Sequence, residues 1–291
     1  MLRLAVATDA ETLERIRDPL AERGIEATYV PTTERAQPLS EPFADGRFDV
    51  GFVYPSRPME GGVADALLDV PWVNGREAIL RSRNKAGTLA RLGRAGIATP
   101  ESVYLSNPVD RSELRAAFER FDPPVVVKPN STTRGIGIAK AYDLDSFLGI
   151  CDYISLVHDY RAADDQSFLV QEFLPDARDF RAMVVDGEYA GAVERRLSSA
   201  DREVGRWKHN VHRGATARGI ELSAEKRRLA EATARELEID WLGVDILVSD
   251  GRALVNETNA RPTVDDATKY EAGFYDRLAA LIERTAESAD E

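Results

Sequence analysis

Short apolar runs alternate with amphipathic stretches over the first eighty residues of the chain. Apolar runs cover residues 2–7, 27–30 and 48–53, and the intervening stretch 10–23 has helical spacing and ends at Gly24. Strands that alternate with a helix in this way favour a parallel sheet. A further strand end at 71–74 precedes a helical segment, 76–95, which Gly96 closes. The pattern predicts a small α/β unit with a parallel sheet, followed by one long helix.

From residue 125 onward the pattern changes to closely spaced strands. Apolar or alternating runs cover residues 125–128, 137–140, 168–171, 181–185 and 189–193. Asp186 and Gly187 form a typical two-residue hairpin turn between the last two runs. A helix is expected from about Ser223 to Leu237, and a closing helix from about 274 to 285. This part is predicted to be α+β, with antiparallel sheets.

The last predicted hairpin carries oxygen-bearing side chains where apolar residues are expected. The run 244–248 leads through a turn at Asp250 and Gly251 into the run 253–259. Because strand side chains alternate between faces, Glu257 and Asn259 share a face, and Asp245 lies about opposite Glu257. Two converging carboxylates are costly to bury unless a cation compensates them, and hard oxygen ligands suit Mg²⁺. The hairpin therefore indicates a metal that carries phosphates, with a solvent-facing strand of ordinary acids as the alternative.

Composition limits the classes of protein to which the chain can belong. With 291 residues and 43% hydrophobic content, the chain can bury a large core in two domains or one elaborated domain. No run approaches the length of a membrane span, and the first residues are expected to form a buried strand and not a signal peptide. The single Cys151 excludes an internal disulfide and a cysteine-based metal cage, so a cytoplasmic location is expected. The net charge of −12 argues against nucleic-acid binding.

Lysine is rare in this chain, since only 6 of its 38 basic residues are lysines. The lysines that remain are therefore good candidates for specific roles. Lys128 ends an apolar strand and precedes a connection rich in hydroxyl groups and glycine, which includes Gly135 and Gly137. Backbone amides of such a loop can donate to phosphate oxygens, which favours a phosphate-covering flap. An ordinary hairpin turn is the alternative, and the Walker pattern is absent.

Two further segments favour anion and nucleotide binding. The run 169–175 passes from a strand into a break at Pro175, where backbone groups can face an adenine edge and Asp179 can accept ribose hydroxyls. The alternative is a buried strand that leaves its sheet at a proline. The segment 194–214 concentrates Arg, Lys, His and Asn residues, which suits a phosphate or a substrate carboxylate. A solvated basic loop is its alternative.

In this order along the chain, these motifs resemble the ATP-grasp ligases, and above all the RimK-type α-L-glutamate ligases. The resemblance is strong from about residue 78 to 281 and weak in the first seventy residues. It implies an α/β N-terminal domain (1–82) and an α+β ATP-grasp domain (83–291). The ATP-grasp domain has a lid subdomain (about 100–170) and a core subdomain (about 171–291), whose antiparallel sheets grip ATP.

The resemblance also implies roles for individual residues. Those expected to bind ATP are Lys85, Lys128, Gly135, Gly137, Gln171, Glu172, Phe173, Asp179 and Lys208. Those expected to hold Mg²⁺ or Mn²⁺, as two ions, are Asp245, Glu257 and Asn259. Those expected to act on the acyl phosphate and the amino-acid substrate are Arg196, Asn210 and Arg213.

The implied activity is ATP-dependent ligation of a carboxylate to an amine through an acyl phosphate, with L-glutamate as the expected amine. The acceptor is an unidentified protein or small-molecule carboxylate, and a homo-oligomer is one expected state. The loop 260–266, which is charged here, and Gly214-Ala215 depart from the family pattern on the substrate side. An ATP-grasp kinase that relies on His212 and a non-catalytic nucleotide-binding module are the alternatives.

Overall fold

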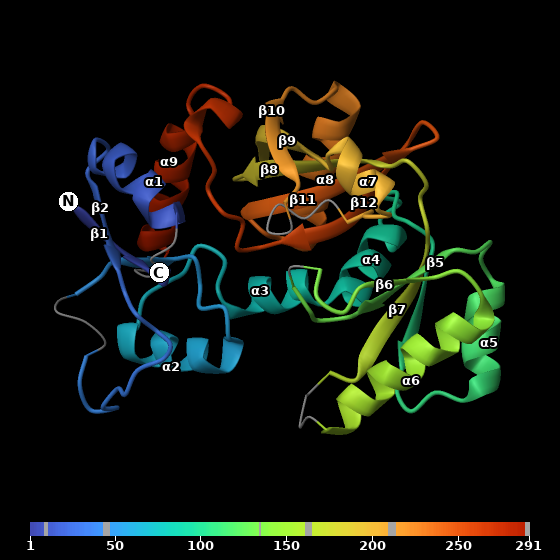
Figure 1. The fold of residues 1–291 in the computed structure, drawn as a ribbon. Coiled ribbons are helices and arrows are strands. Elements are labelled where there is room, and N and C mark those ends of the chain that lie inside the picture. The colour runs from blue at the N-terminus through green and yellow to red at the C-terminus, as the bar shows by residue number, and fades with distance from the viewer. Residues whose placement is uncertain (9–10, 43–46, 134, 161–164, 209–213, 289–291) are drawn as a thin grey trace.

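The computed structural model describes residues 1–8, 11–42, 47–133, 135–160, 165–208 and 214–288. Three separate sheets organise these residues, and each has its own helices (Figure 1). Among the described residues, no helix combines the length and the apolar character needed to cross a membrane. The three sheets belong to an N-terminal unit and to the two halves of the rest of the chain.

The N-terminal sheet is parallel, as its strand-helix-strand pattern predicted. The strand order is β2-β1-β3, and both pairings are parallel. The elements of this unit are β1 (Leu2–Val6), α1 (Glu11–Ala21), β2 (Ile25–Tyr29), β3 (Val50–Phe52) and α2 (Pro58–Leu68). The central strand β1 is fully buried at Leu4, Ala5 and Val6, because it is covered on both sides.

A four-stranded antiparallel sheet, in the order β4-β7-β5-β6, forms the second body. Its elements are β4 (Ser102–Ser106), α5 (Arg111–Glu119), β5 (Val125–Pro129), β6 (Ala139–Ala141), α6 (Leu144–Tyr160) and β7 (Ser167–Glu172). The valines of β5 are β-branched and buried, which suits an inner strand. Helices α5 and α6 cover one face, where Phe118 and Phe147 pack with their ring centroids 5.3 Å apart. The run predicted at 137–140 becomes a strand only from Ala139.

A five-stranded antiparallel sheet, in the order β10-β9-β8-β11-β12, forms the third body. Its elements are β8 (Arg178–Val185), β9 (Glu188–Arg196), α7 (Ser199–Glu203), β10 (Thr216–Ile220), α8 (Ala224–Leu237), β11 (Trp241–Ser249) and β12 (Arg252–Asn259). Both predicted hairpin turns are present, with positive φ at Asp186 and Gly187 and at Asp250 and Gly251. These angles match the two-residue turns that suit the twist of a hairpin.

The two faces of the five-stranded sheet have different partners. Phe180 and Ala182 of β8 and Val244 of β11 share a core with α8. Because strand side chains alternate, Asp179, Arg181 and Asp245 must lie on the opposite face. That face is turned toward the four-stranded sheet, so the alternation within β8 and β11 places the polar side chains between the two sheets.

The single helix predicted over 76–95 is wrong, since the structure has two helices there, α3 (Arg76–Arg83) and α4 (Lys85–Arg94). The break lies at Asn84, whose Oδ1 accepts from the backbone N–H of Gly87 at 2.9 Å and caps α4. Asn130, at the end of β5, donates to the same oxygen and accepts from the backbone N–H of Ala86. A long-range contact therefore sets the break that the helical spacing did not reveal.

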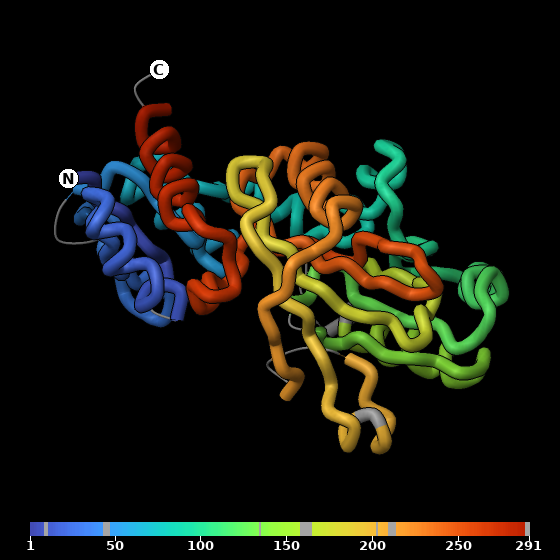
Figure 2. The backbone as a smooth tube through the Cα atoms, turned by 90° about the horizontal axis from the view of Figure 1, so that it is seen from above, coloured from blue at the N-terminus to red at the C-terminus, as the bar shows by residue number. Residues whose placement is uncertain are grey.

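The closing helix α9 (Phe274–Glu287) packs against the N-terminal unit and lies beside α1 (Figure 2). Leu278 and Ile282 of α9 share a core with Leu4 and Ile16, and Trp241 of β11 joins the same core. The short 3₁₀ helix η2 (Ala267–Lys269) precedes α9. The division at residue 82 stays a prediction, and α9 connects the C-terminal part of the chain to the unit that precedes it.

Candidate active site

A cavity of about 600 Å³ lies between the two antiparallel sheets. Its walls come from β5, β6 and β7 on one side and from β8, β9, β11 and β12 on the other. Ten of the residues expected to bind ATP, metal or substrate line it: Lys128, Gly135, Gln171, Glu172, Phe173, Asp179, Arg196, Lys208, Asp245 and Glu257. Its size and its polar lining suit a ligand as large as a nucleotide.

Lys128 is buried at the end of β5, and its ammonium contacts neutral groups. Lys128 Nζ donates to Oε1 of Gln171 and, at 2.8 Å, to Oδ1 of Asn256. Burial lowers the pKa of Lys128 to about 8, although Glu257 partly opposes that shift. A charged amine placed this way is stabilised by an anion that enters the cavity.

Lys85 lies at the first position of α4, just behind the cavity wall. Its Nζ lies 3.4 Å from Oε1 of Glu257 and donates to the backbone carbonyls of Asn130 and Thr132. The side chain is only 5% exposed. Lys85 therefore compensates Glu257 and ties α4 to the loop that follows β5.

The metal prediction depended on Asp245, Glu257 and Asn259 converging. Asp245 pairs with Glu257 in the register of β11 and β12, which the count through the turn predicted to within a residue, and a register shift between Asp245 and Ile246 sets the final pairing. Glu257 and Asp245 both line the cavity, whereas Asn259 is not among its lining residues and its Oδ1 accepts from the backbone N–H of Arg261. Among the described residues, no three His, Cys, Asp or Glu side chains form a group that could hold a metal ion. The structure thus brings two of the three predicted ligands into the cavity.

Two guanidinium groups already compensate the charge of Asp245. Arg181 donates from Nε and Nη2 to the two carboxylate oxygens at 2.7 and 2.9 Å, and Nη2 of Arg195 lies 2.9 Å from Oδ2. Burial raises the pKa of Asp245, but Arg181 and Arg195 outweigh that effect and hold it below its ordinary value. Arg195 also donates to Oδ1 of Asp179 from Nε at 3.0 Å and from Nη2 at 2.5 Å. The sequence argument expected a metal cation in this role, and arginines from neighbouring strands share it.

The predicted adenine hinge lies where β7 leaves the four-stranded sheet. The side chain of Glu172 accepts from the backbone N–H of Glu101 at 2.9 Å and from Arg252 at 3.1 Å. Phe173 meets Trp207 edge to face, with ring centroids 6.0 Å apart. Glu172 thus fixes the hinge while the two rings give the cavity an apolar side.

Gly135 and Gly137 belong to the predicted phosphate flap, and both have positive φ. A Cβ atom on Gly137 would lie 2.7 Å from Cγ of Pro129, so a side chain there would force a shift. Gly135 lines the cavity, whereas Gly137 is not among its lining residues. Lys208, on the segment that follows α7, donates to the carbonyl of Ile138 and so contacts the flap from the other half.

The predicted substrate residues are only partly visible. Arg196 lines the cavity, and its Nη2 donates to Oε2 of Glu194 at 2.6 Å, while Nε of Arg178 donates to Oε1 at 2.9 Å. Burial raises the pKa of Glu194, but the hydrogen bonds from Arg178 and Arg196 together outweigh that effect and hold the pKa below its ordinary value. Asn210 and Arg213 lie outside the described residues.

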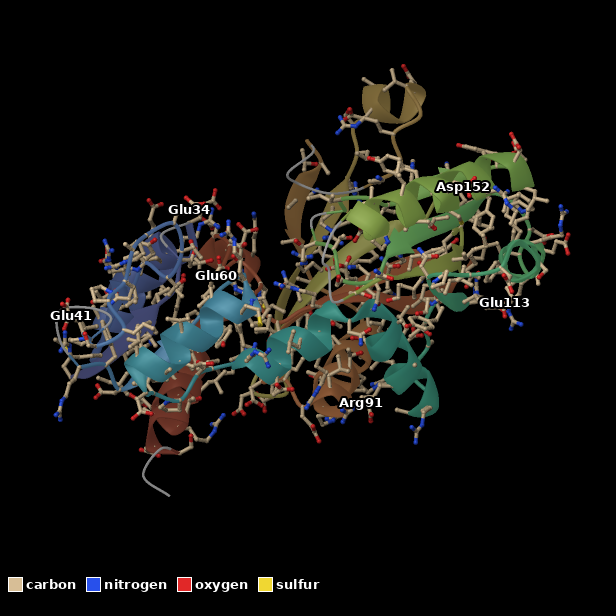
Figure 3. The ribbon with its side chains drawn as sticks, turned by 90° about the horizontal axis from the view of Figure 1, so that it is seen from below. Glu34, Glu41, Glu60, Arg91, Glu113 and Asp152 are labelled. Carbon is tan, nitrogen blue, oxygen red and sulfur yellow. The ribbon has the colours of Figure 1, made fainter. Side chains whose placement is uncertain are left out.

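The charge of the cavity contrasts with that of the whole chain. Figure 3 shows acidic side chains such as Glu34, Glu113 and Asp152 on the outside of the molecule. Seven basic and six acidic side chains line the cavity, although the chain carries a net charge of −12. The excess acid is therefore on the outer surface, and the cavity is the part of the molecule that suits a polyanion.

Sequence reasoning gave no role to Arg195, Lys140 or Asn256. Lys140 Nζ lies 4.4 Å from the ring centroid of Phe173, 5.1 Å from that of Tyr142 and 5.4 Å from that of Trp207. The scarcity of lysine could have drawn attention to Lys140. Arg195 gave no comparable signal, because a run of two arginines does not show which one points inward.

Comparison with known proteins identifies the family. A RimK-like ATP-grasp domain matches residues 82–276. A probable alpha-L-glutamate ligase from Klebsiella pneumoniae (strain 342) is 33% identical over 224 residues, which cover 74% of this chain and 68% of that protein. The ribosomal protein bS6–L-glutamate ligase from Escherichia coli O139:H28 is 32% identical over 206 residues, which cover 68% of this chain and 62% of that protein.

Solved structures agree on the fold. D-alanine–D-alanine ligase from Bacillus anthracis superimposes with a TM-score of 0.68 at 18% identity, over 99% of this chain and 98% of that chain. Its complex with ATP gives a TM-score of 0.66 at 17% identity, with the same coverage. The predicted ATP-grasp fold is confirmed. The chain therefore belongs to the RimK-like ATP-grasp family of ATP-dependent carboxylate–amine ligases, as the order of its motifs predicted.

Proposed function

We propose that this protein joins the amino group of L-glutamate to a carboxylate of a protein or small molecule, at the expense of ATP. One observation carries the proposal: a single cavity holds the buried Lys128 ammonium and the paired carboxylates Asp245 and Glu257. The identity with proteins named glutamate ligases supports glutamate as the amine. The chemistry of ligation needs charge neutralisation and alignment more than a protein nucleophile, which suits these residues.

In this proposal Lys128 and Lys85 bind the phosphates of ATP. Lys128 is the stronger case, because its ammonium donates to the amide oxygens of Gln171 and Asn256. A triphosphate would give that ammonium its anionic partner. Lys85 acts from behind Glu257, and the glycine flap at Gly135 and Gly137 covers the phosphates with backbone amides.

The nucleoside end of ATP is assigned to the hinge. Gln171, Glu172 and Phe173 present backbone groups and a ring to adenine, Asp179 holds the ribose, and Lys208 contacts the nucleotide. Asp179 also accepts from Arg195, so a ribose hydroxyl would bind to a carboxylate that is already oriented. The rings of Phe173 and Trp207 give the base an apolar surface.

The residues present fit divalent cations. Asp245 and Glu257 are hard oxygen donors that face one cavity, and Asn259 follows on the same strand, so these three would hold Mg²⁺ or Mn²⁺, as two ions. When bound, the ions would neutralise the phosphate oxygens. The protein also supplies cations of its own to the negative charges in the cavity. Lys128 does so from the four-stranded sheet, and Arg195 from the five-stranded sheet.

The proposed reaction has two steps, and an acyl phosphate is the intermediate between them. A carboxylate oxygen of the acceptor attacks the γ-phosphorus, ADP leaves, and an acyl phosphate forms. The amine nitrogen then attacks the acyl carbon, inorganic phosphate leaves, and the amine gives up a proton. We assign Arg196, Asn210 and Arg213 to the acyl phosphate and the amino acid, because guanidinium and amide groups bind carboxylate and phosphate oxygens.

A coupled assay of ADP release tests the proposal. The protein is incubated with Mg²⁺, ATP, labelled L-glutamate and an extract of its own organism, with each component omitted in turn. We expect ADP, phosphate and a labelled product only when glutamate and a carboxylate acceptor are both present. ADP formed without glutamate, together with a stable phosphorylated product, would instead indicate a kinase, and an absence of turnover with every acceptor would leave a nucleotide-binding module.

A further inference from the structure

Asp245 makes contacts that conflict with its proposed role as a metal ligand. Both of its oxygens accept hydrogen bonds from arginines, at distances between 2.7 and 2.9 Å. A divalent cation on the same oxygens would meet two guanidinium groups of like charge at close range. Three arginine contacts leave the carboxylate about one free lone-pair site, so departure of one arginine would give a cation more room and less repulsion.

The surroundings of the two arginines show which one leaves. Arg195 is also bonded to Asp179, and its side chain is 9% exposed. The Arg181 side chain is 31% exposed, and in the described part of the chain Asp245 is the only hydrogen-bonding partner of that side chain. Movement of the Arg181 side chain therefore breaks fewer contacts than movement of Arg195, and Arg181 has access to solvent.

The position of Arg181 differs from that of Arg195 as well. Arg195 and Asp245 line the nucleotide cavity, whereas Arg181 is not among its lining residues. Two residues further along the same face of β8, Met183 packs into the core of the N-terminal unit. Arg181 thus lies between the cavity and that unit. On β11, Gly243 is the register partner of Met183, and a Cβ on Gly243 would lie 3.7 Å from Cδ of Arg181.

We propose that Arg181 is the residue that binds the acceptor carboxylate, and that binding of the divalent cation at Asp245 releases it for that purpose. The inference rests on the proposed ligase function for the nature of the acceptor. A guanidinium held in two bonds by a protein carboxylate exchanges it for a substrate carboxylate with the same geometry. Because of this exchange, the acceptor carboxylate would bind only after the nucleotide and its divalent cation are bound.

Chemical labelling of the wild-type protein tests the exchange. Phenylglyoxal reacts with accessible guanidinium groups, and mass spectrometry of peptides quantifies the adduct at Arg181. We expect little adduct with the protein alone, at least threefold more with Mn²⁺ and the non-hydrolysable ATP analogue AMP-PNP, and a return toward the first value when glutarate is added as a carboxylate probe. If Mn²⁺·AMP-PNP leaves the amount of adduct at Arg181 unchanged, the proposed release of Arg181 is refuted. If glutarate leaves it unchanged, the proposed binding of a carboxylate by Arg181 is refuted.

A binding measurement separates competition from a merely structural role. Mn²⁺ binding in the presence of AMP-PNP is followed by electron paramagnetic resonance for the wild type and for Arg181→Gln. Removal of a competing cation should tighten Mn²⁺ binding about tenfold, whereas loss of a structural support would weaken it and refute the proposal. Arg111→Gln, which breaks the exposed pair with Asp152, is the matched control and should bind Mn²⁺ like the wild type. Neither measurement needs turnover, so a failed ligase assay and a failed exchange are separate results.

Discussion

The buried ammonium of Lys128 predicts that nucleotide binding takes up a proton above neutral pH. In the free protein burial lowers the pKa of Lys128 to about 8, from an ordinary value near 10.5. About three quarters of these amines are then neutral at pH 8.5 and about one quarter at pH 7.5. Phosphate oxygens beside the amine favour its charged form and restore the higher pKa. Binding should therefore take up about 0.7 proton at pH 8.5 and about 0.2 at pH 7.5.

Isothermal titration calorimetry measures this uptake. Mg²⁺·AMP-PNP is titrated into the protein at each pH in two buffers whose ionisation enthalpies differ, and the difference in observed heat gives the number of protons. Lys128→Met is the control, because a methionine has similar volume and no titrating group. The difference between wild type and variant removes protons taken up by the nucleotide itself. Equal uptake by the two proteins at pH 8.5 would refute the assignment of Lys128 to the phosphates.

The lowered pKa of Lys128 also makes the free energy of unfolding depend on pH. Because the folded state lowers the pKa of Lys128, it disfavours the charged amine, and this penalty is fully present below about pH 8. The penalty is relieved as the pH rises from about 8 to the unfolded value near 10.5. Lys128→Met should therefore raise the free energy of unfolding at pH 7 by about 1–3 kcal/mol in urea denaturation, although it weakens nucleotide binding.

Four other substitutions have defined outcomes. Cys151→Ala should leave kcat within about twofold of the wild type, because the thiol lies buried in the core of the four-stranded sheet, and should cost about 1 kcal/mol in thermal unfolding; a large loss of activity would point to a cysteine-based mechanism. Glu257→Gln should lower turnover by more than about a hundredfold and weaken Mn²⁺ binding, which titration can follow; an active variant would rule out Glu257 as a ligand. Gly137→Ala should lose about 1–2 kcal/mol of stability, because φ is +75° and the new Cβ meets Pro129 at 2.7 Å. Gly149→Ala, in open space on α6, should instead gain about 0.5–1 kcal/mol, and equal effects at the two glycines would contradict the steric argument.

Local rules were sufficient to predict the hairpin of β11 and β12. The turn residues Asp250 and Gly251 adopt the positive φ angles that a two-residue turn requires. Counting back from that turn puts Asp245 within one residue of Glu257, and a register shift between Asp245 and Ile246 makes the two residues partners. The same reasoning identified the runs that form β5, β7, β8 and β9, because β-branched runs bounded by turns carry their own signal.

Long-range contacts decided what the sequence did not show. Asn84 interrupts a helical pattern because Asn130, from another sheet, bonds to its side chain. The identity of the cations around Asp245 was equally hidden, since Arg181 and Arg195 come from strands that the sequence pattern does not align with β11. Amphipathic spacing shows that α9 must bury one face. It does not show that the face belongs against a sheet formed at the beginning of the chain.

That last contact constrains how the polypeptide acquires its shape during translation. The apolar side of β1 needs Leu278 and Ile282, which the ribosome adds about 270 residues later. Until then α1 covers this core only in part, and residues such as Leu4 lack the cover that α9 gives them. Completion of the N-terminal unit is therefore one of the final events of biosynthesis, and a polypeptide released before α9 would leave its earliest strands open to aggregation.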